Sequence, residues 1–66
     1  MIKMLTLFVT IYNPAIDKEY VIVAGTYEQG VCYVNEYNIN ESNSGLNIEL
    51  KSNGLELSST RCDEAQ

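Results

Sequence analysis

An alternation of apolar side chains over residues 2–12 constrains the fold of this chain most strongly. The run reads IKMLTLFVTIY, and the odd-numbered members from Leu5 to Ile11 point to one side of a strand. That side is uniformly aliphatic and predicts a core-facing surface. The other side carries Met4, Phe8 and Tyr12 and is about half apolar, which is more than a solvated face needs. We interpret it as a possible self-association face or a partner surface; single exposed apolar groups are the plainer alternative.

A second strand is predicted over residues 20–24, which read YVIVA. Asn13 and Pro14 open a turn between the two strands, and the pair predicts an antiparallel hairpin. Since the second strand is apolar on both faces, we expect it to lie inside a sheet and not at an edge.

A helix is predicted to begin at Thr26, directly after a glycine that stops the strand. The Thr26 hydroxyl can accept from amides of the first turn, and Gln29 completes a capping-box pattern. A helical wheel separates an apolar side from a polar side. We expect Val31 and Val34 to be buried, and Glu28 and Glu36 to be exposed.

The residues around Asn53 and Gly54 alternate on both sides of this pair, which predicts a second β-hairpin over residues 46–60. The expected fold class is therefore α+β in the order β-β-α-β-β. A four-stranded antiparallel sheet, with strand order 2-1-3-4, would carry one helix packed on one face. We expect one domain over residues 1–60 and a frayed polar C-terminal tail over residues 61–66.

Size and composition exclude several kinds of site. At 66 residues a domain has a small core and marginal stability. The chain has no His and two Cys, too few good ligands for a zinc site, so no metal or cofactor is expected. No apolar secretion segment opens the sequence and no run is long enough to span a membrane. We therefore expect a cytoplasmic protein in which Cys32 and Cys62 are free thiols, although they could bridge.

The sequence predicts no catalytic residues. The commonest general base, His, is absent, and no group is placed to activate a Cys nucleophile. The glycines are scattered and form no phosphate-binding loop. We therefore expect a protein that is not an enzyme.

Charge points toward binding. Nine acidic residues against four basic ones give a net charge of −5, which should repel nucleic acid and anionic lipid and attract a basic surface. We expect neither direct nucleic-acid binding nor a membrane role. The candidate partner-binding carboxylates are expected at the first turn, on the helix and on the second hairpin, in one patch or two. They are Asp17, Glu19, Glu28, Glu36, Glu49 and Glu56.

The first half of the chain resembles small acidic phage anti-CRISPR proteins that act against type I systems. The resemblance rests on Val9-Thr10, Asn13-Pro14, Glu19-Tyr20-Val21 and Ala24-Gly25, followed by Tyr33 and Tyr37 four residues apart on a helix. It implies an inhibitor that binds the basic DNA-recognising surface of a CRISPR effector complex in the host cytosol, with carboxylates in place of DNA phosphates. The second half of the sequence departs from the resemblance, because a hairpin is predicted here where such a protein carries another helix.

A small homodimeric accessory or structural subunit is the alternative function. Such a protein would use the outer face of the first hairpin, where Met4, Phe8 and Tyr12 lie. The two hypotheses differ in what mutation does, because only the inhibitor depends on carboxylates.

Overall fold

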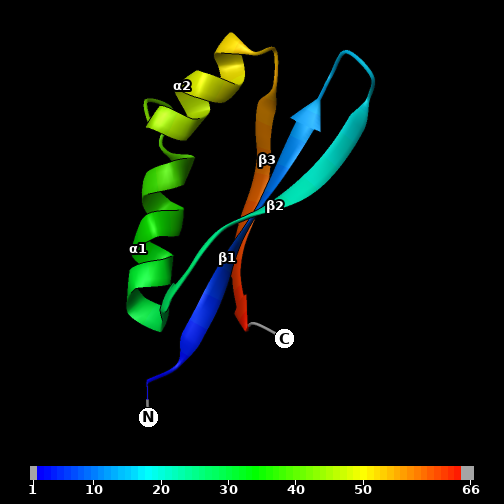
Figure 1. Ribbon diagram of the computed structural model, residues 1–66. Helices are drawn as coiled ribbons and strands as arrows, with labels where there is room; N and C mark the ends of the chain where they lie inside the picture. The colour runs from blue at the N-terminus through cyan, green and yellow to red at the C-terminus, as the bar shows by residue number, and fades with distance from the viewer. Residues whose placement is uncertain (1, 65–66) are drawn as a thin grey trace.

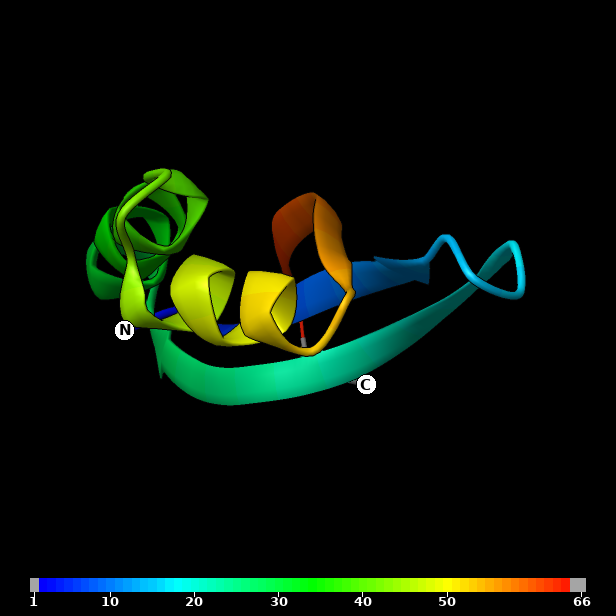
Figure 2. The same ribbon diagram turned by 90° about the horizontal axis from the view of Figure 1, so that it is seen from above.

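The computed structural model describes residues 2–64 as a three-stranded antiparallel sheet with two helices against one face (Figure 1). The molecule is long and flat, with extents of 44 × 25 × 12 Å. Seen from above, both helices lie on the same side of the sheet and the strand β2 runs along its margin (Figure 2). The elements are β1 (Met4–Asn13), β2 (Lys18–Glu28), α1 (Gln29–Asn40), α2 (Gly45–Ser52) and β3 (Glu56–Glu64).

The strand β1 lies at the centre of the sheet, as predicted, in the order β2-β1-β3. Both of its pairings are antiparallel. Its pairing with β2 shifts register between Leu7 and Phe8, which leaves Ala24 as an extra residue in β2. A second shift, between Thr10 and Ile11, leaves Ser58 as an extra residue in β3.

The predicted core face of β1 is confirmed. Its odd-numbered residues from Leu5 to Ile11 are at most 3% exposed and form the centre of the hydrophobic core. The helices cover them with Cys32 of α1 and Leu50 of α2. The opposite face of the sheet, which we call the open face, carries Met4 and the other even-numbered residues of β1. Neither helix covers this face (Figure 2).

The predicted second hairpin is wrong, because its first strand is the helix α2. Ser44 caps this helix, since its hydroxyl accepts a hydrogen bond from the Asn47 amide at 3.1 Å. The buried Asn47 side chain donates to two backbone carbonyls at the end of α1, those of Ile39 and Glu41. These bonds fix a tight helix-to-helix connection. The sheet therefore has three strands and two helices, where four strands and one helix were predicted.

Asn53 and Gly54 end α2 and do not form a hairpin turn. Gly54 has a φ of +76°, its amide donates to the Lys51 carbonyl, and the amide of Leu55 donates to the Leu50 carbonyl. This pair of bonds is the Schellman arrangement at a helix C-terminus, which uses a glycine with positive φ. Asn-Gly is thus compatible with a hairpin turn and with a helix C-terminus, and tertiary packing selects the helix C-terminus here.

The start and the orientation of α1 also differ from the prediction. The helix begins at Gln29, whereas Thr26 still belongs to β2 and lies opposite Thr6 of β1. The buried side of α1 carries Cys32, while Val31 and Val34 are 47% and 60% exposed. The prediction that these valines are buried is therefore wrong, because Cys32 is joined to β3 and turns that side of the helix toward the sheet.

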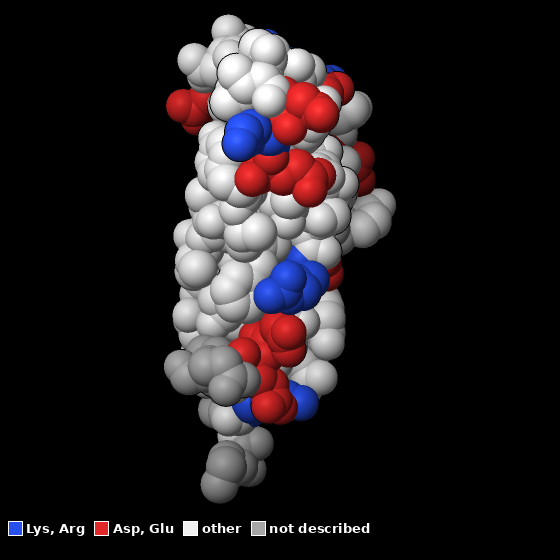
Figure 3. Space-filling model, turned by 90° about the vertical axis from the view of Figure 1, so that its right-hand side faces the viewer, with Lys and Arg blue, Asp and Glu red and all other residues white. Residues whose placement is uncertain are grey.

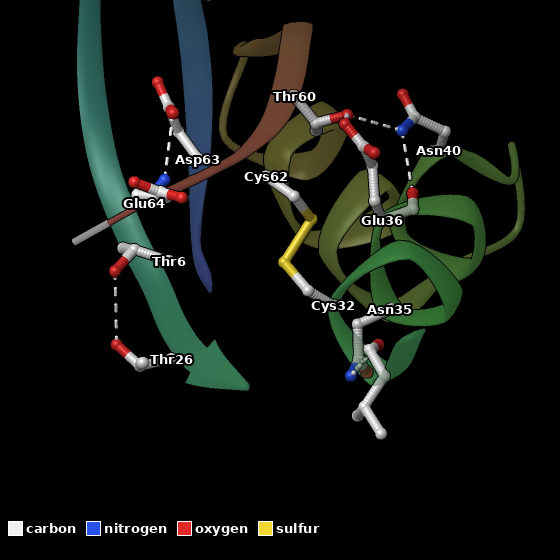
Figure 4. The surroundings of a disulfide bond; sticks show 11 residues. Thr6, Thr26, Cys32, Asn35, Glu36, Asn40, Thr60, Cys62, Asp63 and Glu64 are labelled. Atoms are coloured by element: carbon white, nitrogen blue, oxygen red, sulfur yellow. Dashed lines mark hydrogen bonds between the residues drawn. A yellow bond between two sulfur atoms is a disulfide. The ribbon is translucent and has the colours of Figure 1, made fainter. Parts of the chain in front are cut away.

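Cys32 and Cys62 form a disulfide that joins α1 to β3 across 30 residues (Figure 4). The expectation of two free thiols is therefore wrong. The reason lies in the end of the chain, which was expected to be a frayed tail. Residues 61–64 extend β3 beside β1, and this places Cys62 directly under the helix. Ala65 and Gln66 lie outside the described residues.

Candidate functional site

Three carboxylates gather at the end of the sheet that is nearest the first turn. Tyr12, at this end of β1, lies opposite Glu19 of β2 and opposite Glu56 of β3. Its hydroxyl donates a hydrogen bond of 2.6 Å to a carboxylate oxygen of Asp17. We call Asp17, Glu19 and Glu56 the acidic cluster. The three were separate candidates in the sequence, and the pairing of both outer strands with β1 brings them together.

The turn positions Asp17 through its backbone. Asp17 has a φ of +53°, the left-handed region that Asp tolerates better than most residues. The turn begins with the Asn13 side chain, which accepts a hydrogen bond from the Ala15 amide at 3.1 Å. Such a side-chain bond to the residue two positions on is a common way for Asn to open a turn.

A shallow depression of about 340 Å³ lies between the carboxylates of the two outer strands. Tyr12 lies between Glu19 and Glu56, and Leu57 and Ser58 complete the lining. Ser58 donates a hydrogen bond of 3.0 Å to Glu19, which ties the outer strands together across β1. The depression is open to solvent, so it suits contact with a protruding side chain better than enclosure of a small molecule.

The acidic cluster changes the proton affinity of the tyrosine at its centre. The hydrogen bond to Asp17 raises the pKa of the Tyr12 hydroxyl above its ordinary value of 10.0, and partial desolvation and the charges of Glu56 and Glu19 act in the same direction. Ionised Tyr12 would place a fourth negative charge among three carboxylates. Tyr12 is therefore a neutral donor that holds Asp17 in place.

The end of the sheet that is far from the first turn carries two ion pairs. Lys3 pairs with Glu64 at 2.9 Å, and Arg61 pairs with Asp63 at 3.4 Å. These are the ion pairs within residues 2–64, so the acidic cluster has no cation partner there. Figure 3, which views the molecule from the side opposite the helices, shows acidic and basic side chains interspersed along it. The cluster therefore differs from the far end of the sheet, where Asp63 and Glu64 each have a cation partner.

The remaining predicted carboxylates do not join the cluster. Glu28 is exposed, as predicted, and lies beside Met4 at the far end of β2. Glu36 is half-buried and accepts a hydrogen bond of 2.9 Å from Thr60 of β3 (Figure 4), so the predicted outward stripe of Glu28 and Glu36 is wrong. Glu49 is exposed on α2 and not on an outer hairpin face.

The predicted self-association face is only partly apolar. Met4 is 46% exposed, but Phe8 and Tyr12 are half-buried. The Arg61 guanidinium lies over the Phe8 ring, 4.5 Å from its centroid, and the Tyr12 hydroxyl donates a hydrogen bond to Asp17. A cation thus lies over the Phe8 ring, and a carboxylate binds the Tyr12 hydroxyl. Association through this face remains a prediction.

A more exposed apolar surface, which was not predicted from the sequence, lies on β2. From Tyr20 to Val23 every side chain is at least 37% exposed, although this stretch was expected inside the sheet. The sequence shows only that this strand is apolar on both faces, and that pattern predicted burial.

The described part of the chain holds no group of three or more Cys, Asp or Glu side chains arranged to bind a metal ion. Neither of its helices is long and apolar enough to cross a membrane. Comparison with known proteins found no matching family model, no matching curated protein and no matching solved structure.

Proposed function

We propose that this chain is a non-catalytic binding protein whose acidic cluster docks on a basic, nucleic-acid-recognising surface of another protein. The observation that carries the proposal is the gathering of Asp17, Glu19 and Glu56 around Tyr12 with no ion-pair partner within residues 2–64. Uncompensated carboxylates on a chain of net charge −5 attract Lys-rich and Arg-rich surfaces and speed the encounter with them.

The finer proposal is an inhibitor that blocks DNA access, in which the carboxylates take the place of phosphates. The resemblance to anti-CRISPR proteins makes the effector complex of a type I CRISPR system the first candidate partner. The helix α2 removes one departure from the resemblance, because a hairpin was predicted where such a protein carries another helix. The proposed setting is the cytosol of the host cell, with no cofactor.

The disulfide affects the choice of the cytosol as the proposed compartment. Disulfides persist in oxidising compartments and are rare in the cytosol. Cys32 is fully buried against the core, so its reduction would change the packing of α1 as well as the covalent link. The oxidised and the reduced protein must therefore both be tested for binding.

The test is a competition experiment with a purified type I effector complex and labelled target DNA. The protein should displace the DNA, and the affinity should fall steeply as salt rises, because screening weakens long-range charge contacts. Glu19→Gln with Glu56→Gln should weaken inhibition by about tenfold or more, as expected when contacts worth at least 1.4 kcal/mol are lost. Asp63→Asn with Glu64→Gln removes the same charge from side chains that are already paired, and should weaken it far less.

Three outcomes would contradict the proposal at different levels. Equal losses in the two double variants would show that net charge acts without the cluster. An inhibitor that leaves DNA bound and blocks a later step would contradict mimicry of DNA. If neither the oxidised nor the reduced protein binds the complex at low salt, the inhibitor assignment is wrong.

The second candidate function is the homodimeric accessory subunit. The observation that favours it is the exposed apolar surface of β2, from Tyr20 to Val23, and not the outer face first considered.

A further inference from the structure

The strand β2 forms one margin of the sheet and has no neighbour on its outer side within residues 2–64. Tyr20, Val21, Ile22 and Val23 are 46%, 55%, 37% and 61% exposed. The pairing with β1 places Val21 and Val23 on the open face and Tyr20 and Ile22 on the helix side. The strand therefore presents apolar side chains on both of its faces together with an unpaired backbone edge.

Unpaired N–H and C=O groups along an apolar strand specify the kind of partner. Another strand can satisfy the backbone groups and cover both rows of side chains at once, whereas a helix or a small molecule satisfies only one of these needs. Natural proteins usually guard such an edge with central charges or proline. The stretch from Tyr20 to Ala24 contains neither.

We propose that β2 pairs antiparallel with β2 of a second copy and joins two three-stranded sheets into one six-stranded sheet. A two-fold axis places the same strand on both sides and closes the assembly as a dimer. The extra residue at Ala24 limits regular pairing about an axis at Val21 to Glu19–Val23. An axis at Val21 sets Tyr20 opposite Ile22 of the second copy on the helix side, and Val21 opposite its own copy on the open face.

Charge placement favours this arrangement. The charged residues of β2 lie at its ends, Lys18 and Glu19 at one and Glu28 at the other, with none between. Antiparallel pairing about Val21 separates the two Glu19 residues by four positions, about 14 Å at 3.4 Å per residue. That distance exceeds the Debye length of about 8 Å at physiological ionic strength, so the copies are not held apart by these charges.

The other margin of the sheet does not offer the same surface. β3 carries Glu56, Arg61 and Asp63 along its length, and such charges discourage strand addition. Pairing of β2 with β3 of another copy would also be head-to-tail and would build a ring or an open filament in place of a two-fold dimer. The edge of β2 therefore favours its own copy.

The size of the contact sets the expected affinity. A standard interface buries about 800 Å² per partner, which is roughly a sixth of the 4543 Å² exposed by this chain. Pairing over five residues of each copy covers less than that and belongs with weak interfaces. We expect a dissociation constant of roughly 10–100 µM, so the dimer should depend on concentration.

Sedimentation equilibrium of the disulfide-bonded protein, from about 5 µM to 1 mM, tests the proposal. The mean mass should rise from the 7.4 kDa of one chain toward twice that value. Val21→Lys places two ammonium groups beside each other at the two-fold axis and should weaken the dimer at least tenfold. Val34→Lys on α1 is the matched control, since Val34 is 60% exposed and Val21 is 55% exposed, and it should leave the dimer intact.

Circular dichroism and a free-thiol assay show whether each variant is folded and oxidised. If Val21→Lys does not fold, Val21→Thr keeps the β-branched shape and should weaken the dimer several-fold. A single 7.4 kDa species up to 1 mM would overturn the proposal. So would a dimer that both Val21 variants leave unchanged, or one that Val34→Lys abolishes.

Discussion

The two margins of the sheet are built in opposite ways. β3 is tied to α1 by the disulfide of Cys32 and Cys62, and it also contacts α2. β2 joins the rest of the molecule through β1 and the start of α1, and its side chains from Lys18 to Ala24 are all exposed. Yet the sequence of β2 is the more apolar of the two. The helices thus cover the more polar strand, β3, and leave the more apolar strand, β2, exposed.

This contrast shows that the position of the helices, and not strand hydrophobicity alone, decides which margin of the sheet is covered. Both helices lie toward β3 because one covalent bond and two hydrogen bonds hold α1 there: Asn40 donates to Thr60 at 2.8 Å, and Thr60 donates to Glu36 at 2.9 Å (Figure 4). An apolar margin that the fold leaves uncovered is available to another chain.

Removing the disulfide should have the largest effect. Cys32→Ser with Cys62→Ser releases a link across 30 residues, and the chain-entropy model predicts a loss of about 3–4 kcal/mol in the free energy of unfolding. For a domain of this size that is a large part of the total. Urea unfolding of the variant and of the reduced wild type should give similar losses; a loss below about 1 kcal/mol in both would mean that β3 is not held mainly by this bond.

Shortening a side chain in the central strand should cost nearly as much. Leu7 is fully buried, so Leu7→Ala should lower the free energy of unfolding by about 3 kcal/mol. Ile22 is the least exposed of the apolar side chains at the bare margin, at 37%, and Ile22→Ala should cost about 1 kcal/mol in dilute solution, where the chain is monomeric. Equal losses by urea unfolding would show that β2 is packed as firmly as β1.

Cutting the hydrogen bonds between β3 and α1 should cost about 1 kcal/mol. Thr60→Val keeps the shape of the side chain but removes the hydroxyl that joins Asn40 and Glu36. The control is Ser59→Ala, since Ser59 is exposed on the adjacent position of β3 and should change stability by less than about 0.5 kcal/mol. If the two variants melt at the same temperature, this network does not fix α1 over β3.

The sequence predicted the centre of the fold because β1 leaves little choice. Four aliphatic residues on one side of a long strand require a cover on that side, and a long apolar strand suits the centre of a sheet. The core from Leu5 to Ile11 and the α+β class follow from that pattern. The part from Ser44 to Gly54 could not be predicted, because its helix depends on bonds that Asn47 makes to the end of α1. Local alternation and the Asn-Gly pair favoured a hairpin there.

The residues of the candidate site were predicted from the sequence, but their arrangement on one surface was not. Asp17, Glu19 and Glu56 were all named in advance, yet only the strand order places Glu56 across β1 from Glu19. Glu36 was misplaced because the orientation of α1 depends on Cys32 finding Cys62 thirty residues later. A disulfide between residues so far apart produces no periodic pattern in the sequence from which it could be predicted.

The smallest expected effect lies at Tyr12, where carboxylates from both margins meet. Its pKa is raised above 10.0 by the bond to Asp17, so the folded state holds this proton more tightly than the unfolded state. The resulting stabilisation is present below pH 10 and is lost as pH rises through the raised value. Tyr12→Phe should reduce this alkaline loss and remove a late component from the ultraviolet titration of the five tyrosines.

The control for this titration is Tyr37→Phe, because Tyr37 is 69% exposed and lies on α1, on the other side of the sheet from Glu19 and Glu56. It should leave the late component unchanged. If Tyr12→Phe leaves that component in place as well, the hydrogen bond to Asp17 is not formed in solution.

The difference between the two margins is tested most directly by amide hydrogen exchange at two protein concentrations, one well below and one well above the expected dissociation constant. Amides of β2 from Glu19 to Val23 that do not pair with β1 should exchange rapidly in the dilute sample and become protected in the concentrated one. Amides of β3 from Leu57 to Cys62 should exchange at the same rate in both. Protection that does not change in β2, or that rises in β3 instead, would contradict the account.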